Sequence, residues 1–178
     1  MGHSERGMRD KLQSEKFLFV IKMKDRNLII TRPGEADLDS VYRILDSCAN
    51  DLISKGQNYW KGAYPMERVA NMLRKHDVRL VYEDDSPIAI ATFTIGDKAP
   101  FGRQHVWDEI KPRKAKYLSA FGVMPEMQGI GIGSFICDSV ADIARGQGHD
   151  TLRINTERRL LNYYSRRGFE VVHHTDVD

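Results

Sequence analysis

The sequence has few cysteines, little net charge and no long apolar run. Its two cysteines, Cys48 and Cys137, stand far apart among 178 residues, which excludes a disulfide framework and leaves no metal-ligand spacing. No stretch approaches the run of about 20 apolar residues that a membrane-spanning helix needs. A net charge of +2 is too small to indicate a nucleic-acid-binding protein. These absences predict a cytoplasmic protein without a membrane or nucleic-acid partner.

The overall composition is that of a globular protein. Hydrophobic residues make up 41% of the chain and charged residues 29%, which are ordinary values for such proteins. The length suits one domain with a sizeable core. We expect a leader with an extra strand over residues 1–26 and a single domain over residues 27–178.

The hydrophobic periodicity predicts the order of the secondary-structure elements. Short apolar, β-rich runs predict strands over residues 17–23, 27–32, 78–83, 88–95, 117–123, 151–155 and 169–174. Apolar residues three and four apart predict helices over residues 36–54, 66–75 and 158–166, with another helix after Gly133. The pattern therefore predicts a mixed α/β sheet covered by helices, but it leaves the order of the strands open.

The most informative stretch runs from Tyr117 to Ser134 and reads YLSAFGVMPEMQGIGIGS. A strand there leads into a glycine-rich helix start, where backbone N–H groups lack partners and the helix dipole is positive. Glycine allows a ligand to approach the backbone closely, because it has no Cβ. We interpret the stretch as an anion cradle that suits phosphate. The alternative is that the glycines only allow tight packing between helix and strand.

Two common phosphate-binding motifs do not fit this stretch. A P-loop needs Lys followed by Ser or Thr after its last glycine, whereas Gly133 is followed by Ser134 and Phe135. The dinucleotide fingerprint needs a small residue where Ile132 stands, and an acidic residue after the next strand, which reads TLRIN. The pattern Gln-x-x-Gly-x-Gly, from Gln128 to Gly133, fits better. It resembles the coenzyme A pyrophosphate loop of the GNAT family of N-acetyltransferases.

Two later features resemble the same family in the same order. They are the helix and strand after the cradle, and the ending NYYSRRGF, which is similar to the family's Tyr-x-x-x-Gly-Phe signature. The resemblance covers residues 27–174. It implies a mixed, mostly antiparallel sheet that is flanked by helices and splayed at an acetyl-CoA site. It also implies acetyl-CoA as co-substrate and no metal.

The resemblance implies roles for individual residues. Tyr164, four residues before Gly168, takes the position of the family's general acid, whereas Tyr163 stands where the family has an apolar core residue. The end of the central strand takes the position of the backbone that binds pantetheine and the oxyanion, with Gly122 suited to a bulge. The family often has asparagine where Glu157 stands, so Asn155 or Asn162 is the expected substitute. The cofactor-binding residues are thus Phe121, Gly122, Val123, Gln128, Gly129, Ile130, Gly131, Ile132, Gly133, Ser134, Asn155 and Asn162.

The acceptor side is less well defined by the sequence. The aromatic loop over residues 57–65 places Trp60 and Tyr64 either along a substrate pocket or over the core beneath it. The long irregular segment over residues 97–114 adds Trp107 and Glu109 as substrate-binding candidates. The same segment holds the candidates for a general base, which are His105, Asp108 and Glu109.

The aromatic residues resemble those of family members that act on small molecules. We therefore expect a small-molecule primary amine as acceptor, and a monomer or homodimer. A peptide or protein amine is one alternative, and a coenzyme A-binding regulator without catalysis is another. The family commonly has a further strand after the Gly-Phe strand, where this sequence stops at Asp178. We expect residues 17–23 to fill that vacant sheet edge, within the chain or by exchange with a second copy.

Overall fold

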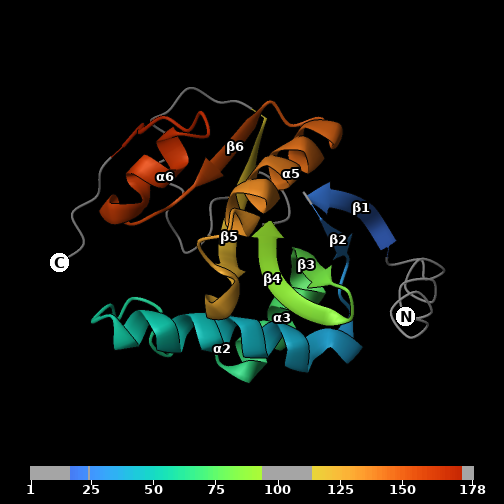
Figure 1. The fold of residues 1–178 in the computed structure, drawn as a ribbon. Helices are drawn as coiled ribbons and strands as arrows, with labels where there is room; N and C mark the ends of the chain where they lie inside the picture. Colours follow the sequence, from blue (N-terminus) through green and yellow to red (C-terminus); the bar gives the residue numbers. More distant parts are fainter. Residues whose placement is uncertain (1–16, 24, 94–113, 174–178) are drawn as a thin grey trace.

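The computed structural model describes residues 17–23, 25–93 and 114–173 (Figure 1). The first half contains strands β1 (Phe17–Met23) and β2 (Arg26–Thr31), the 3-10 turn η1 (Glu35–Asp37), helices α2 (Leu38–Ser54) and α3 (Met66–Lys75), and strands β3 (Asp77–Glu83) and β4 (Ser86–Phe93). The second half contains β5 (Ala115–Val123), η3 (Pro125–Met127), α5 (Ile132–Gly146), β6 (Thr151–Ile154), η4 (Arg158–Leu160) and α6 (Leu161–Ser165). None of the helices in these ranges is long and apolar enough to cross a membrane.

The six strands form one sheet in the order of the chain, from β1 to β6. Neighbouring strands from β1 to β5 pair antiparallel, and β6 pairs parallel to β5. The predicted mixed, mostly antiparallel sheet is confirmed. A parallel neighbour requires a crossover, and α5 supplies it between β5 and β6.

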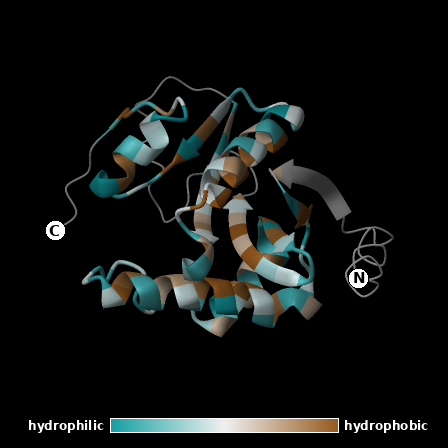
Figure 2. Cartoon of the chain, in the orientation of Figure 1, coloured by the Kyte–Doolittle hydropathy of each residue, from teal (hydrophilic) through white to brown (hydrophobic). Residues whose placement is uncertain are grey.

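Helices α2 and α3 cover one face of the sheet and α5 covers the other (Figure 1). Successive side chains of a strand point to opposite faces. Leu28 and Ile30 accordingly pack in the core beneath α5, while Ile29 packs in the core beneath α2 and α3. Figure 2 shows apolar positions recurring along both long helices and the central strands, with hydrophilic positions between them. The two cores hold β5 in the middle of the molecule.

Two predictions about the sheet are wrong. β1 pairs with β2, with Met23 opposite Arg26, and it lies at the opposite edge from β6. It therefore does not fill the edge beyond β6, because a short connection keeps consecutive strands adjacent. The predicted last strand is absent from residues 169–173, and residue 174 lies outside the described residues. The Phe169 N–H donates to the Tyr164 carbonyl at 3.2 Å, which turns the chain back onto α6.

A buried cluster of charges lies where β3 and β5 begin. Arg79 is 1% exposed and donates to both carboxylate oxygens of Asp77, at 2.8 Å to Oδ2. Lys116 Nζ lies 3.7 Å from the same carboxylate, and Arg32 Nε lies 3.4 Å from it. A buried charge is tolerated when it is paired and hydrogen-bonded, so Asp77 is what allows Arg79 to stay inside the sheet.

Candidate active site

One groove of about 1880 Å³ runs along the ends of β5 and β6. The C-terminal half of α2 and the loop after it line one side, and the chain from β6 through α6 lines the other. Figure 1 shows the end of α2 and α6 on the same side of the molecule, both to the left of β5. The two strands pair only from Ala115 with Thr151 to Leu118 with Ile154, so the end of β5, here called its free end, runs beyond β6 to Val123 and pairs only with β4. The groove therefore opens where the sheet splays.

A β-bulge distorts β5 beside the groove. Gly122 pairs with Ile90 and Ser119 pairs with Thr92, so β5 has one more residue than β4 in this interval. The bulged residue is Ala120, whose φ of +44° is unusual for a residue with a Cβ. The expectation that the bulge lies at Gly122 is wrong, because Gly122 keeps its partner in the ladder. Ala120 and Phe121, which have no partner in β4 or β6, are the residues released from regular pairing.

The glycine-rich stretch forms a loop that leads into the first turn of α5. Gly131 precedes the helix with a φ of +96°, and Gly129 has a φ of +78°, so both adopt the left-handed conformation that favours glycine. A Cβ at either position would meet no atom within 4 Å, which leaves their outer side open. No side chain caps the helix start. The N–H groups of its first turn therefore lack a side-chain cap, and they lie at the positive end of the helix beside the groove that Gly131, Gly133 and Ser134 line.

The carbonyl of Val123 connects this loop to the rest of the site. Gln128 Nε2 donates to it at 2.9 Å, and the Cys48 thiol of α2 donates to it at 3.2 Å. Burial, followed by the charges of Asp51 and Glu126, raises the pKa of Cys48 to about 12. The thiol therefore stays protonated and keeps this hydrogen bond at neutral pH.

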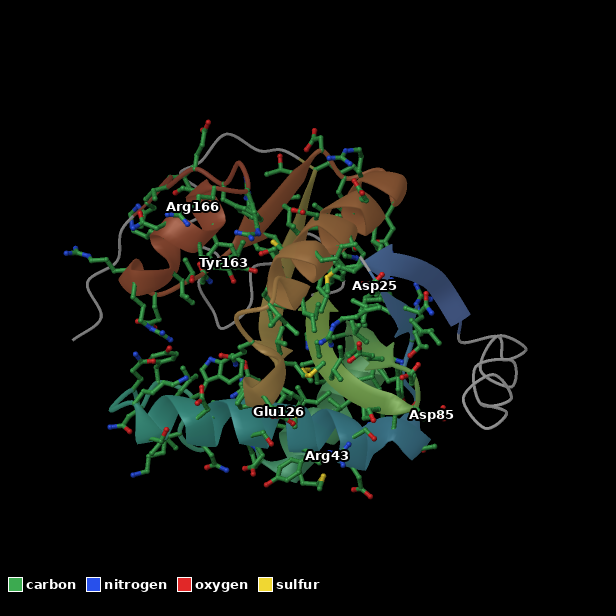
Figure 3. The ribbon with its side chains drawn as sticks, viewed as in Figure 1. Asp25, Arg43, Asp85, Glu126, Tyr163 and Arg166 are labelled. Carbon is green, nitrogen blue, oxygen red and sulfur yellow. The ribbon has the colours of Figure 1, made fainter. Side chains whose placement is uncertain are left out.

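Helix α6 contributes two tyrosines to the groove, and the more buried one is Tyr164, which is 8% exposed. Its ring packs edge-on against Phe169 with 5.5 Å between centroids. Burial raises its pKa above the usual value for tyrosine, so its hydroxyl is a proton donor at neutral pH. The expectation that Tyr163 is the core residue of the pair is wrong. Its hydroxyl reaches the first turn of α5, where Gly133 has no Cβ to exclude it (Figure 3).

Arg167 fastens α6 to the start of α5. Its guanidinium lies over the Tyr163 ring, 4.0 Å from the centroid, and donates to the Tyr163 carbonyl at 2.6 Å. It also donates to the hydroxyl of Ser134 in the first turn of α5. The cradle and the helix that bears Tyr164 are thus held together by one side chain.

The aromatic loop between α2 and α3 forms the opposite wall. The rings of Trp60 and Tyr64 pack edge-on with centroids 5.1 Å apart, and both line the groove. Trp60 Cη2 would lie 3.7 Å from a Cβ at Gly122, so the indole stands against the free end of β5. Both rings also pack on the core beneath α2 and α3. The two interpretations of this loop, pocket wall and core cover, therefore hold together.

The match to a family model decides what kind of protein this is. Residues 38–169 match the model described as the Acetyltransferase (GNAT) family, a span that runs from the start of α2 to Phe169. The chain belongs to the GNAT acetyltransferase family. Membership of this family supports acyltransferase activity. The matched residues include the glycine-rich cradle, the end of β5 beyond β6, and helix α6 with its two tyrosines.

Solved GNAT structures share this fold at low sequence identity. A GNAT-family acetyltransferase from Listeria monocytogenes has a TM-score of 0.73 and 14% identity, covering 89% of this chain and 95% of that one. The PaiA N-acetyltransferase from Thermoplasma acidophilum, in complex with coenzyme A, has a TM-score of 0.65 and 15% identity, covering 84% and 92%. An aminoglycoside N-acetyltransferase in complex with CoA has a TM-score of 0.63 and 11% identity, covering 89% and 97%. None of the curated sequences compared with the chain is similar to it.

Most of the predicted cofactor-binding residues of this GNAT chain line the groove. They are Phe121, Gly122, Val123, Gln128, Gly129, Gly131, Gly133, Ser134 and Asn155. Ile130 is exposed and Ile132 is fully buried, so neither side chain lines it. Asn162 lines a separate pocket of about 560 Å³ beside α6. The roles of all these residues stay predictions.

Several groove residues were not predicted from the sequence. In the sequence, Cys48 and Asp51 show only the spacing of an amphipathic helix. Tyr59 and Arg159 belong to no motif, yet all four residues line the groove. The substrate and base candidates Trp107, Glu109, His105 and Asp108 lie outside the described residues. No group of three or more His, Cys, Asp or Glu residues that could hold a metal ion occurs in the described part of the chain.

Proposed function

We propose that this GNAT protein transfers the acetyl group of acetyl-CoA to the primary amine of a small molecule by direct attack. One observation carries the proposal: the cradle, the bulged free end of β5 and Tyr164 all line a single groove. The open glycine backbone at the start of α5 suits a pyrophosphate. The presence of coenzyme A in the PaiA and aminoglycoside N-acetyltransferase structures supports the same cofactor here.

The groove supplies the groups that such a transfer needs. The amine must first lose a proton, after which its nitrogen bonds to the acetyl carbon and the carbon–sulfur bond breaks. The negative charge that develops on the carbonyl oxygen requires an N–H donor, and the backbone at Phe121, which lies outside the regular ladder, provides one. The coenzyme A thiolate then takes the proton of the Tyr164 hydroxyl, and the tyrosinate recovers a proton, the one that the attacking nitrogen loses as the amide forms. Because its pKa is raised, the Tyr164 hydroxyl is still protonated at neutral pH when the thiolate forms.

The walls of the groove favour a small acceptor. Trp60 and Tyr64 form a rigid aromatic surface against the free end of β5. Tyr64 is further braced by Arg68, whose guanidinium lies 5.6 Å from the ring centroid. Pockets for small ligands are typically lined by such apolar and aromatic side chains, with few polar groups to fix orientation.

The test is coenzyme A release from acetyl-CoA over a panel of amines and peptides, for the wild type, Tyr164→Phe and Tyr163→Phe. A positioned general acid contributes about 10²–10⁴-fold, so Tyr164→Phe should slow release by about 10²-fold or more. Tyr163→Phe, the neighbouring matched change, should have a much smaller effect. Acetyl-CoA binding without release on any amine would point to a regulator, and release only on peptides would point to a protein acceptor.

A further inference from the structure

The two walls of the groove touch each other on the acceptor side. Tyr59 lies in the loop after α2, and Arg159 lies in η4, far along the sequence. The Arg159 guanidinium carbon lies 5.4 Å from the centroid of the Tyr59 ring, which is a cation–π contact. Both residues line the groove. The contact therefore joins the aromatic wall to the wall that leads into α6.

Arg159 retains its capacity to bind an anion in this position. A guanidinium that lies over a ring still has its N–H groups at its edge, and their fork matches a carboxylate or a phosphate. No ion pair joins Arg158 or Arg159 to an acidic residue within the described ranges. The acceptor side of the groove thus has a positive group that is orientated by Tyr59 and that no carboxylate of the described residues neutralises.

A carboxylate lies on the opposite wall. Asp51 follows Cys48 by three residues on α2, and its side chain is 19% exposed and lines the same groove. Lys55 Nζ lies 2.6 Å from its Oδ2 oxygen. Cys48 connects this part of α2 to the Val123 carbonyl, at the free end of β5. Asp51 therefore lies on the side next to the proposed site of acetyl transfer, paired with Lys55, which lines the same groove.

We propose that the acceptor is a small amine that also bears an anionic group, either a carboxylate or a phosphate. Arg159 binds the anionic group beneath Tyr59, and Asp51 attracts the ammonium before it is deprotonated for attack on the acetyl carbon. The Arg159 guanidinium on one wall and the Asp51 carboxylate, with its Lys55 partner, on the other distinguish the two ends of such a molecule and orient it along the groove. The assignment rests on the acetyl transfer proposed above and names the class of acceptor for it.

The test compares matched pairs of amines that differ only in the anionic group. Lysine is paired with cadaverine and ornithine with putrescine for the carboxylate, and phosphoethanolamine with ethanolamine for the phosphate. The wild type should prefer the anionic member of at least one set. Arg159→Ala should reduce kcat/KM for that member by about tenfold to a hundredfold, mainly through KM, as expected for loss of a charged hydrogen-bonded pair. The member without the anionic group should change by less than about threefold.

Two further variants separate the orientation of the guanidinium from its charge. Tyr59→Phe keeps the aromatic face and should retain the preference, whereas Tyr59→Ala should lose part of it. Arg43→Ala is the matched control, because Arg43 is exposed on the outer side of α2 and does not line the groove (Figure 3). Its pairwise preference should equal that of the wild type.

The outcomes distinguish this assignment from the proposed function. Equal losses on both members of a pair would overturn the anion-binding role of Arg159. Weaker acetyl-CoA binding by Arg159→Ala, measured by calorimetry, with no change in acceptor preference would assign Arg159 to the cofactor instead. Release with peptides or with amines that lack an anionic group, and no preference for amines that bear one, would overturn the acceptor class but keep the acetyltransferase. No release with any acceptor would overturn both.

Discussion

The close packing around Gly122 makes its replacement by alanine a sharp test of how the site is built. A Cβ there would lie 3.1 Å from Cys48 Sγ, 3.7 Å from Trp60 Cη2 and 3.8 Å from Ile90 Cγ2. Favourable carbon contacts lie at about 3.5–4.0 Å, so the thiol would have to move by a few tenths of an ångström. Cys48 resists this, because it is 5% exposed and bonded to the Val123 carbonyl.

The expected magnitude follows from two opposing effects. Overpacking a filled core costs about 1–3 kcal/mol. Replacing glycine by alanine in a strand contributes about 0.5–1 kcal/mol in the other direction, because the unfolded glycine has more conformational freedom. Gly122→Ala should therefore lower the free energy of unfolding of the wild type by about 1 kcal/mol. In a Cys48→Ala background the close contact is gone, and the same change should raise it by about 0.5 kcal/mol.

The assay is urea denaturation of the four proteins of this double-mutant cycle. Gly146→Ala provides the control, because Gly146 ends α5 and a Cβ there would meet nothing within 4 Å. It should have the same effect in both backgrounds. If Gly122→Ala changes stability equally with and without the thiol, to within about 0.5 kcal/mol, the packing argument is refuted.

Two further predictions concern the sheet. Asp77→Ala removes the carboxylate paired with buried Arg79 and should lower the free energy of unfolding by about 3–5 kcal/mol. The control is Glu83→Ala, which removes the partly exposed pair with Arg26 and should lower it by less than about 1 kcal/mol. Equal losses in urea denaturation would contradict this. Burial raises the pKa of Tyr82 to about 12, above the unfolded value of about 10. Its contribution to stability is therefore present below pH 10 and is lost between pH 10 and 12, so Tyr82→Phe should flatten the alkaline decline in thermal melts. An unaltered decline would count against it.

The elements were predictable where burial of one face dictates the spacing of apolar residues. The helix α3 spans residues 66–75 and β1 spans residues 17–23, as the sequence predicts. The segment over residues 169–173 has apolar residues as well, but Val171 and Val172 are about half exposed. Its conformation is set by the contacts of Phe169 with Tyr164, which its own composition does not reveal.

Local sequence also gave no sign of the bulge or of the partner of β1. Alanine has no preference for positive φ, so the strain at Ala120 appears only when β4 and β5 are aligned. The pattern of apolar residues shows that a segment is a strand, but it does not show which strand pairs with it. The pattern is the same at either edge of a sheet.

The candidate site was predictable in part for a related reason. The cradle and the tyrosine helix are each encoded within a few consecutive residues, so their spacing is visible in the sequence. The contact between Tyr59 and Arg159, and the position of Asp51 beside the groove, join distant segments. Such juxtapositions depend on the splay of β5 from β6, which sequence spacing does not encode.

The Val123 carbonyl has a consequence for how two substrates bind. It accepts hydrogen bonds from the loop of the cradle and from the helix that carries Asp51. The cofactor side and the acceptor side therefore share one backbone oxygen, and a shift of either side changes the bonding of the other. Thermodynamic linkage then requires reciprocity: acetyl-CoA changes the affinity for the acceptor by the same factor by which the acceptor changes the affinity for acetyl-CoA. We expect the two to bind cooperatively, whichever arrives first.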